Sequence, residues 1–295
     1  MSQLSDITTI KSVLSRHGFH FAKSLGQNFL INPEVCPRMA EESGAGKGVG
    51  VLEVGPGIGV LTAELAARTE KVVSVELDQR LLPVLEETLG GFSNVKVING
   101  DILKIDLQKL IAEEFAGMDV AVCANLPYYI TSPVIMRLLE ERLPIRSITV
   151  MVQKEAADRL CALPGSRECG AVSAAVQYFA EPRILFGVNR TSFLPSPNVD
   201  SAVIRLDIRK EPEVRINNEK HFFALVKAAF GQRRKTVLNS VSAGLSLAKE
   251  QVAAALERSG IAANARAEQL TMEQLAALSN QIFAGREQTG GSQNE

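Results

Sequence analysis

The chain of 295 residues is 46% hydrophobic and 22% charged, and its formal net charge at pH 7 is −1. This length exceeds what one small core needs, so we expect a catalytic domain of about 200 residues and a smaller second domain. Four cysteines without CxxC spacing and an N-terminus without a long apolar run argue against a disulfide scaffold, a signal peptide and a membrane span, and we expect a cytoplasmic protein.

Strand and helix patterns alternate from about residue 50 to 155, which predicts parallel strands joined by covering helices in a doubly wound, Rossmann-like α/β domain. The predicted strands are 49–54, 71–75, 95–99, 119–124 and 147–153, and the predicted helices are 59–68, 79–88, 107–115 and 133–141. The strand at 119–124 is so apolar that we expect it at the centre of the sheet.

In the second half of the chain, two further predicted strands, 180–188 and 202–208, are followed by a helical pattern. Residues 210–214, with charge and Pro212, resemble a linker. Helical segments are then predicted at 222–230, 234–243, 248–259 and 272–283. We therefore expect a first domain over 1–209, a small all-helical C-terminal domain over 210–287 and a disordered Gly/Ser/Gln-rich tail over 288–295.

A glycine-rich turn links the first predicted strand to the first helix, with the sequence Glu53-Val-Gly55-Pro-Gly57-Ile-Gly59. Glycines at such a junction let the backbone turn tightly and approach a ligand closely. Dinucleotide-binding folds use GxGxxG to hold a pyrophosphate, whereas GxGxG preceded by an acid resembles S-adenosylmethionine-dependent methyltransferases. A tight turn that binds nothing is the alternative.

Two acids, Glu76 and Asp101, each follow a predicted strand at the sheet edge where doubly wound folds bind ligands. Glu76 comes about 20 residues after the first glycine, where a carboxylate can accept both ribose hydroxyls. Asp101 can accept a hydrogen bond from the adenine amino group of the cofactor. Either acid alone can also be a solvated strand end, but together with the glycines they favour a cofactor site.

The tetrapeptide Asn125-Leu126-Pro127-Tyr128 ends the fourth predicted strand. An exocyclic adenine amine is a poor nucleophile because its lone pair is delocalised into the ring. The Asn125 side-chain oxygen and the Leu126 carbonyl can each accept one N–H bond, which aims the lone pair at a methyl donor, while Tyr128 stacks on the base. Alignment then supplies much of the acceleration without a strong general base. A strand end broken by proline is the alternative.

The motif order resembles the bacterial ribosomal RNA adenine N6-dimethyltransferases of the KsgA type over nearly the whole chain. The motifs that carry this resemblance are Gln27–Leu30, Glu53–Gly59, Glu76–Asp78, Gly100–Asp101, Asn125–Tyr128 and Phe193–Ala202. The resemblance implies a class I methyltransferase domain and dimethylation of two adjacent adenosines in a hairpin loop near the 3′ end of 16S rRNA, with a role in maturation of the small ribosomal subunit.

The same resemblance implies roles for individual residues. The implied cofactor contacts are Asn28, Leu30, Gly55, Gly57, Glu76, Asp101 and Asn125. Phe193 is implied to close the face of the target adenine opposite Tyr128, although without the family Asn28 and Phe193 would be interpreted as a turn residue and a core aromatic. Tyr129 departs from the commonest family form, which has a smaller polar residue there, and this puts contacts to flanking bases in doubt.

The near-neutral total charge hides an uneven distribution, since residues 142–240 hold 16 Lys and Arg against 9 Asp and Glu. RNA binding depends on such cations. Arg233, Arg234 and Lys235 lie within 221–240, a stretch without acids, and are the predicted phosphate contacts. A solvated helix face is the alternative. The three histidines and the cysteines have no metal-ligand spacing, so we expect no metal, and we expect a monomer.

Two other functions stay open at this point. An antibiotic-resistance-type methyltransferase of large-subunit rRNA shares the cofactor and base motifs, but the long helical C-terminal region and the Phe193 motif favour the small-subunit enzyme. A ribosome-assembly or transcription factor that kept the fold and lost the activity is the third hypothesis, because a fold alone never guarantees chemistry. The intact Glu76, Asp101 and Asn125 argue against it.

Overall fold

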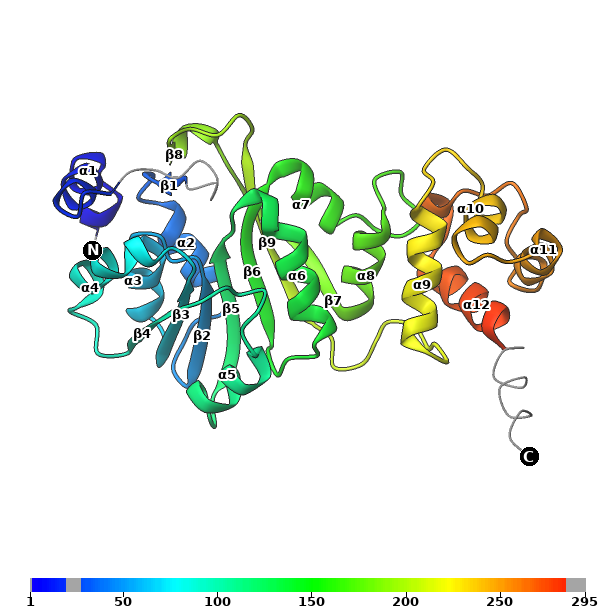
Figure 1. The fold of residues 1–295 in the computed structure, drawn as a ribbon, viewed down its shortest axis with the longest axis horizontal. Coiled ribbons are helices and arrows are strands. Elements are labelled where there is room, and N and C mark those ends of the chain that lie inside the picture. The colour runs from blue at the N-terminus through cyan, green and yellow to red at the C-terminus, as the bar shows by residue number, and fades with distance from the viewer. Residues whose placement is uncertain (1, 20–27, 285–295) are drawn as a thin grey trace. The chain divides into compact units, whose positions relative to one another are not determined.

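The computed structural model describes residues 2–19 and 28–284, and the chain forms two compact units (Figure 1). The first comprises Met1–Ala157 and Pro182–Ile208, and the second comprises Asp158–Glu181 and Arg209–Glu295. The predicted boundary after residue 209 falls where the chain enters the second unit for the second time, while 158–181, predicted within the first domain, group with the second unit. Gln27 and the predicted disordered tail lie outside the described residues.

The first unit is built on a seven-stranded mixed sheet in the order β4-β3-β2-β5-β6-β9-β7. The strands are β2 (Val49–Val54), β3 (Lys71–Glu76), β4 (Val95–Asn99), β5 (Asp119–Asn125), β6 (Ser147–Gln153), β7 (Ala180–Val188) and β9 (Ser201–Ile208). The strands β2 to β6 pair in parallel and β9 pairs antiparallel to β6. β5 is the central strand, as its apolar sequence predicted, and the α/β fold class is confirmed.

Helices connect these strands. The alternating pattern predicted α3 (Val60–Ala66), α4 (Leu82–Leu89), α5 (Leu107–Glu114) and α6 (Thr131–Glu140), whereas α7 (Lys154–Leu160) and the preceding α1 (Ile7–Arg16) and α2 (Val35–Glu42) were not predicted. α2 and α3 pack on the sheet through a buried cluster that includes Met39, Leu65, Val51 and Val72. Because parallel strands all run the same way, their carboxyl ends meet at one edge of the sheet, and the loops there lie close together.

A two-stranded sheet brings together two segments that are far apart in the sequence. β1 (Phe29–Leu30) pairs antiparallel with β8 (Phe193–Leu194), so that Leu30 lies opposite Phe193. The short 3-10 helix η5 (Arg190–Ser192) precedes β8, and the Ile31 N–H donates to the Ser192 carbonyl at 2.8 Å. This pairing was not predicted.

The second unit is helical. Its helices are α8 (Ala171–Phe179), α9 (Glu219–Phe230), α10 (Val237–Gly244), α11 (Lys249–Arg258) and α12 (Met272–Phe283). Tyr178 and Phe179 of α8 pack against Phe222 and Phe223 of α9 with ring-centroid distances of 5.3–5.4 Å, and the Tyr178 hydroxyl donates to Glu219 Oε1 at 2.8 Å. The helical C-terminal region predicted from His221 onward is confirmed, whereas α8 was not predicted.

Candidate functional site

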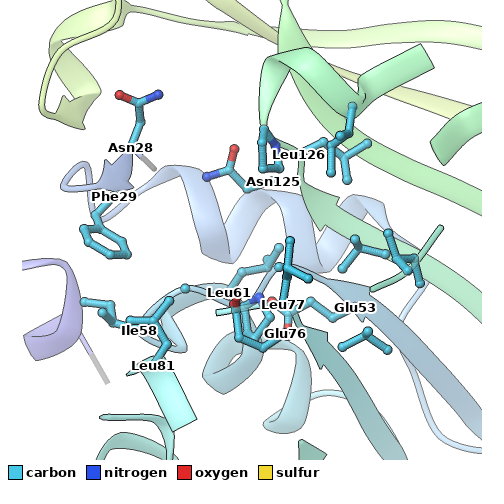
Figure 2. A pocket seen from close by; sticks show the side chains of 18 of the residues that line it. Asn28, Phe29, Glu53, Ile58, Leu61, Glu76, Leu77, Leu81, Asn125 and Leu126 are labelled. Atoms are coloured by element: carbon cyan, nitrogen blue, oxygen red, sulfur yellow. The ribbon is translucent and has the colours of Figure 1, made fainter. Parts of the chain in front are cut away.

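A cavity of about 280 Å³ opens at the carboxyl ends of β2, β3 and β5. The residues that line it include every residue for which a cofactor or base contact was predicted: Asn28, Leu30, Gly55, Gly57, Glu76, Asp101, Asn125, Leu126, Pro127, Tyr128 and Phe193. Figure 2 shows Asn28 and Asn125 on one side of this cavity and Glu76 on the other. The fold therefore brings the predicted set together, while the role of each residue stays a prediction.

The glycine-rich turn after β2 forms one wall of the cavity. Gly55, Gly57 and Gly59 have φ angles of +68°, +61° and +89°, in the left-handed region that favours glycine. The Gly55 N–H donates to the Val75 carbonyl at 3.0 Å, which ties the turn to β3. A Cβ on Gly59 would lie 2.9 Å from Leu89 Cδ2. Backbone conformation and packing together require glycines in this turn.

Glu53, the acid ahead of the glycines, is fully buried at the cavity wall. Its Oε2 accepts hydrogen bonds from the Thr62 hydroxyl at 2.7 Å and the Ser74 hydroxyl at 2.6 Å. Burial raises the pKa of Glu53 to about 7, and the two hydroxyl donors oppose that rise without cancelling it. The sequence marked this acid as part of the motif but gave no indication that it would be buried with two donors.

Glu76 and Asp101 lie at the ends of β3 and β4 and reach the same cavity. Glu76 is buried and accepts from the Asp78 N–H at 2.8 Å, and desolvation by burial raises its pKa. Asp101 is more exposed; it accepts from the Leu103 N–H at 3.0 Å and forms an ion pair with Lys104 at 3.3 Å. These bonds hold both carboxyl groups in position beside the cavity.

The tetrapeptide continues from β5 into the 3-10 helix η4 (Tyr128–Ile130). Asn125 lies opposite Met151 of β6, and the buried Leu126 donates its N–H to the Met151 carbonyl at 3.4 Å. The Tyr128 and Ser201 hydroxyl oxygens are 2.8 Å apart, and burial raises the pKa of Tyr128. Bonds to two neighbouring strands thus fix this segment at the cavity.

Phe193 and the N-terminal segment enter the site through the β1–β8 pairing. Phe193 is buried and lies opposite Leu30, while Asn28 immediately precedes β1. These three residues were assigned to the site by the family resemblance alone. Neither two-residue strand carries a local pattern that would predict the pairing.

The three predicted phosphate contacts lie in the second unit, in the loop between α9 and α10. The side chains of Arg233, Arg234 and Lys235 are exposed, and none forms an ion pair with a described residue. The helix was predicted to begin at Arg234 but begins at Val237, because the Thr236 hydroxyl caps it by accepting from the Asn239 N–H. These residues therefore lie on an exposed loop rather than on a helix face, and their contact with phosphate stays a prediction.

Two general properties complete the description. Within residues 2–19 and 28–284, the structure has no helix that combines the length and the apolar character needed to cross a bilayer. Across those same ranges, no group of three or more His, Cys, Asp or Glu side chains is arranged to hold a metal ion.

Comparison with known families agrees with this geometry. The family model described as ribosomal RNA adenine dimethylase matches residues 18–283. Two curated relatives, each called ribosomal RNA small subunit methyltransferase A, come from a Geobacillus strain and from Anoxybacillus flavithermus. Both are 50% identical to this chain, over 92% of it and 95% of the relative in the first case and over 94% and 95% in the second.

Solved structures show the same fold. A dimethyladenosine transferase from Plasmodium falciparum has a TM-score of 0.71 at 25% identity and covers 89% of this chain and 98% of its own. The 23S rRNA methyltransferase ErmE has a TM-score of 0.67 at 29% identity and covers 86% of this chain and 99% of its own.

Proposed function

The chain belongs to the ribosomal RNA adenine dimethylase family, and from this membership we propose its methyl donor, its substrate and the roles of its site residues. The enzyme is an rRNA adenine methyltransferase, as its motifs predicted. Its proposed reaction is N6-dimethylation of two adjacent adenosines in the 3′-terminal hairpin loop of 16S rRNA within the immature small subunit. The observation that carries this proposal is the convergence of the tetrapeptide and the acidic strand ends on one cavity.

S-adenosylmethionine is the proposed donor, and when bound it supplies a methyl group activated by its sulfonium. The residues that line the cavity suit this molecule. The glycine turn leaves the backbone open to close approach at Gly55, where no atom lies within 4 Å of a Cβ position. The Glu76 carboxylate would accept hydrogen bonds from the ribose hydroxyls, and the Asp101 carboxylate would accept one from the adenine amino group. Asn28 and Leu30 would hold the donor from the side of β1.

The target amine would be held at the end of β5. The Asn125 side-chain oxygen and the Leu126 carbonyl each accept one N–H, so the nitrogen lone pair is directed into the cavity. Tyr128 and Phe193 cover the two faces of the base. Leu126 is 2% exposed, and this burial keeps its carbonyl in a water-poor site where hydrogen bonds orient the amine strongly. The product of one transfer retains an N–H, which permits a second round.

RNA would contact the exposed cations at 233–235. Each Lys or Arg that neutralises a phosphate releases counterions, so this loop contributes affinity without sequence selection. The Val237 N–H donates to the Ala265 carbonyl at 2.8 Å, which ties the end of the basic loop to the segment before η6 (Ala267–Gln269).

A polar groove in the same unit extends this surface. Arg167 and Arg266 line it, and neither forms an ion pair with a described residue. The amide oxygens of Gln269 and Gln274 accept backbone N–H bonds at 2.8 and 3.1 Å, which leaves their NH₂ groups as donors. Glu268 is the acid among the lining residues. A surface of mostly donors suits a phosphate backbone.

Large-subunit rRNA is the second candidate substrate, because the ErmE structure is similar over most of its length. The relatives at 50% identity carry a small-subunit name, which favours the first candidate. Mass spectrometry of both ribosomal RNAs, from cells with and without this protein, separates them. Dimethyladenosine that depends on the protein should occur in 16S rRNA. Its occurrence in 23S rRNA, or in neither, would overturn the proposed substrate.

A further inference from the structure

The mouth of the cavity carries two exposed apolar side chains from different strand ends. Leu77 follows β3 and is 49% exposed, and Tyr129 follows β5 and is 56% exposed, although both line the cavity. They belong to a set of six exposed large hydrophobic side chains in the described part of the chain. Single exposed apolar residues are common on protein surfaces, but two at one cavity mouth indicate a place that meets an apolar group.

Local geometry separates Tyr129 from Tyr128. Both belong to η4, and successive side chains of a 3-10 helix point about 120° apart. The bond to Ser201 turns the Tyr128 ring toward β9. Tyr129 therefore points elsewhere, and among the residues that the structure describes its ring contacts no other aromatic ring and its hydroxyl has no hydrogen-bond partner. Over residues 2–19 and 28–284, neither an aromatic contact nor a hydrogen bond accounts for this exposed ring.

An enzyme that modifies a base in a folded RNA must take the base out of its stack. The extruded base leaves its neighbour in the chain without a stacking partner on that side. An exposed aromatic ring beside the base pocket replaces the lost surface, and the larger rings of purines give it more area than pyrimidines do.

We propose that Tyr129 stacks on the base next to the target adenine and so selects substrates with a neighbouring purine. This inference rests on the proposed function. In a loop with two adjacent adenosines, one adenine would occupy the cavity while the other lies against Tyr129.

The test measures binding of a hairpin RNA with two adjacent loop adenosines to the intact protein. Tyr129→Ala should weaken binding by about 5- to 150-fold, the range expected for losing one base–aromatic stack. Tyr129→Phe should recover most of it, because the ring suffices. Ile184→Ala removes a side chain that is 47% exposed on β7 and outside the cavity lining, and is the matched control.

A second RNA, abasic at the position next to the target, makes the test specific. Wild-type protein should bind it as weakly as Tyr129→Ala binds the intact RNA, and Tyr129→Ala should not distinguish the two RNAs. If removing the neighbouring base weakens RNA binding equally for wild type and Tyr129→Ala, that base does not contact Tyr129 and the proposal is overturned. Methylation of immature small subunits by both proteins with equal KM refutes only the role of Tyr129, whereas wild-type protein that methylates neither these subunits nor the hairpin overturns the proposed function as well.

Discussion

Replacing Glu53 by Gln should change how the stability of the first unit depends on pH. The pKa of Glu53 is raised from 4.5 to about 7 in the folded protein by burial. A carboxyl group with a raised pKa favours the folded state at low pH, and this contribution is lost as pH rises from about 4.5 through about 7. Below that window both states are protonated, and above it the folded protein holds a buried charge.

The magnitude follows from the shift. One pKa unit corresponds to about 1.4 kcal/mol, so wild-type protein should lose about 2–3 kcal/mol of unfolding free energy from this group between pH 5 and pH 8. In a unit of this size that is roughly 4–12 °C in Tm. Gln keeps an oxygen that accepts from Thr62 and Ser74, but it does not ionise in this range, so Glu53→Gln should lack this part of the pH dependence.

Scanning calorimetry of wild type and variant at pH 5, 6, 7 and 8 measures the difference between the two profiles. Groups that do not interact with Glu53 cancel in this difference, which therefore reports Glu53 together with its electrostatic coupling to Glu76. Glu70→Gln changes an exposed glutamate immediately before β3 and controls for the loss of one surface charge. If Glu53→Gln keeps the wild-type slope, the carboxyl does not titrate near neutrality, and the account of its burial is wrong.

Three further predictions concern the cofactor turn, the base pocket and the RNA surface. Asn125→Ala should leave donor affinity in calorimetry largely in place, since the other implied cofactor contacts remain, yet reduce turnover by about 10²–10³-fold, the cost of losing one preorganised hydrogen-bonding group. Near-normal turnover would exclude this role. Gly59→Ala should destabilise the fold in thermal unfolding by about 1–2 kcal/mol or more because of its positive φ, whereas Gly91→Ala, with open space around it, should not; equal stabilities contradict the packing argument. Replacing residues 233–235 together by alanine should reduce the slope of log affinity for RNA against log salt concentration by about 2. An unchanged slope would show that RNA binds at another surface.

The sheet was predictable because its strands are short apolar runs bounded by turn residues. The predicted bounds of β4, β6, β7 and α12 agree with the structure residue for residue. The ends of other helices shifted where capping decides them. α3, predicted over 59–68, begins at Val60, because Gly59 is held in a left-handed conformation, and α10 begins after its Thr236 cap.

Four α-helices, α1, α2, α7 and α8, were not predicted, and two of them, α1 and α8, were missed for opposite reasons. α1 carries a helical signal that went unused, because Ile10, Val13 and Leu14 recur at helical spacing after the Asp6 cap. α8 carries almost none: seven of its nine residues are buried, so its sequence lacks the polar face by which an amphipathic helix is recognised.

Some residues of the candidate site could be predicted from local sequence patterns, whereas others depend on contacts between distant parts of the chain. Glu53, Glu76, Asp101 and Asn125 follow or end strands, and a parallel sheet brings such positions to one edge whatever the loops do. Motif spacing therefore sufficed for them.

Asn28 and Phe193 depend instead on the pairing of β1 with β8, which joins residues more than 160 positions apart through two residues on each side. Such a contact has no local period, and its loop-closure cost is recovered only when the whole unit folds. Phe193 and the N-terminal segment therefore complete the cavity only in the folded first unit, while the positions of the acids follow from sheet topology alone. A substitution that breaks the β1–β8 pairing should consequently open the side of the cavity where Asn28 lies and leave the acidic strand ends in place.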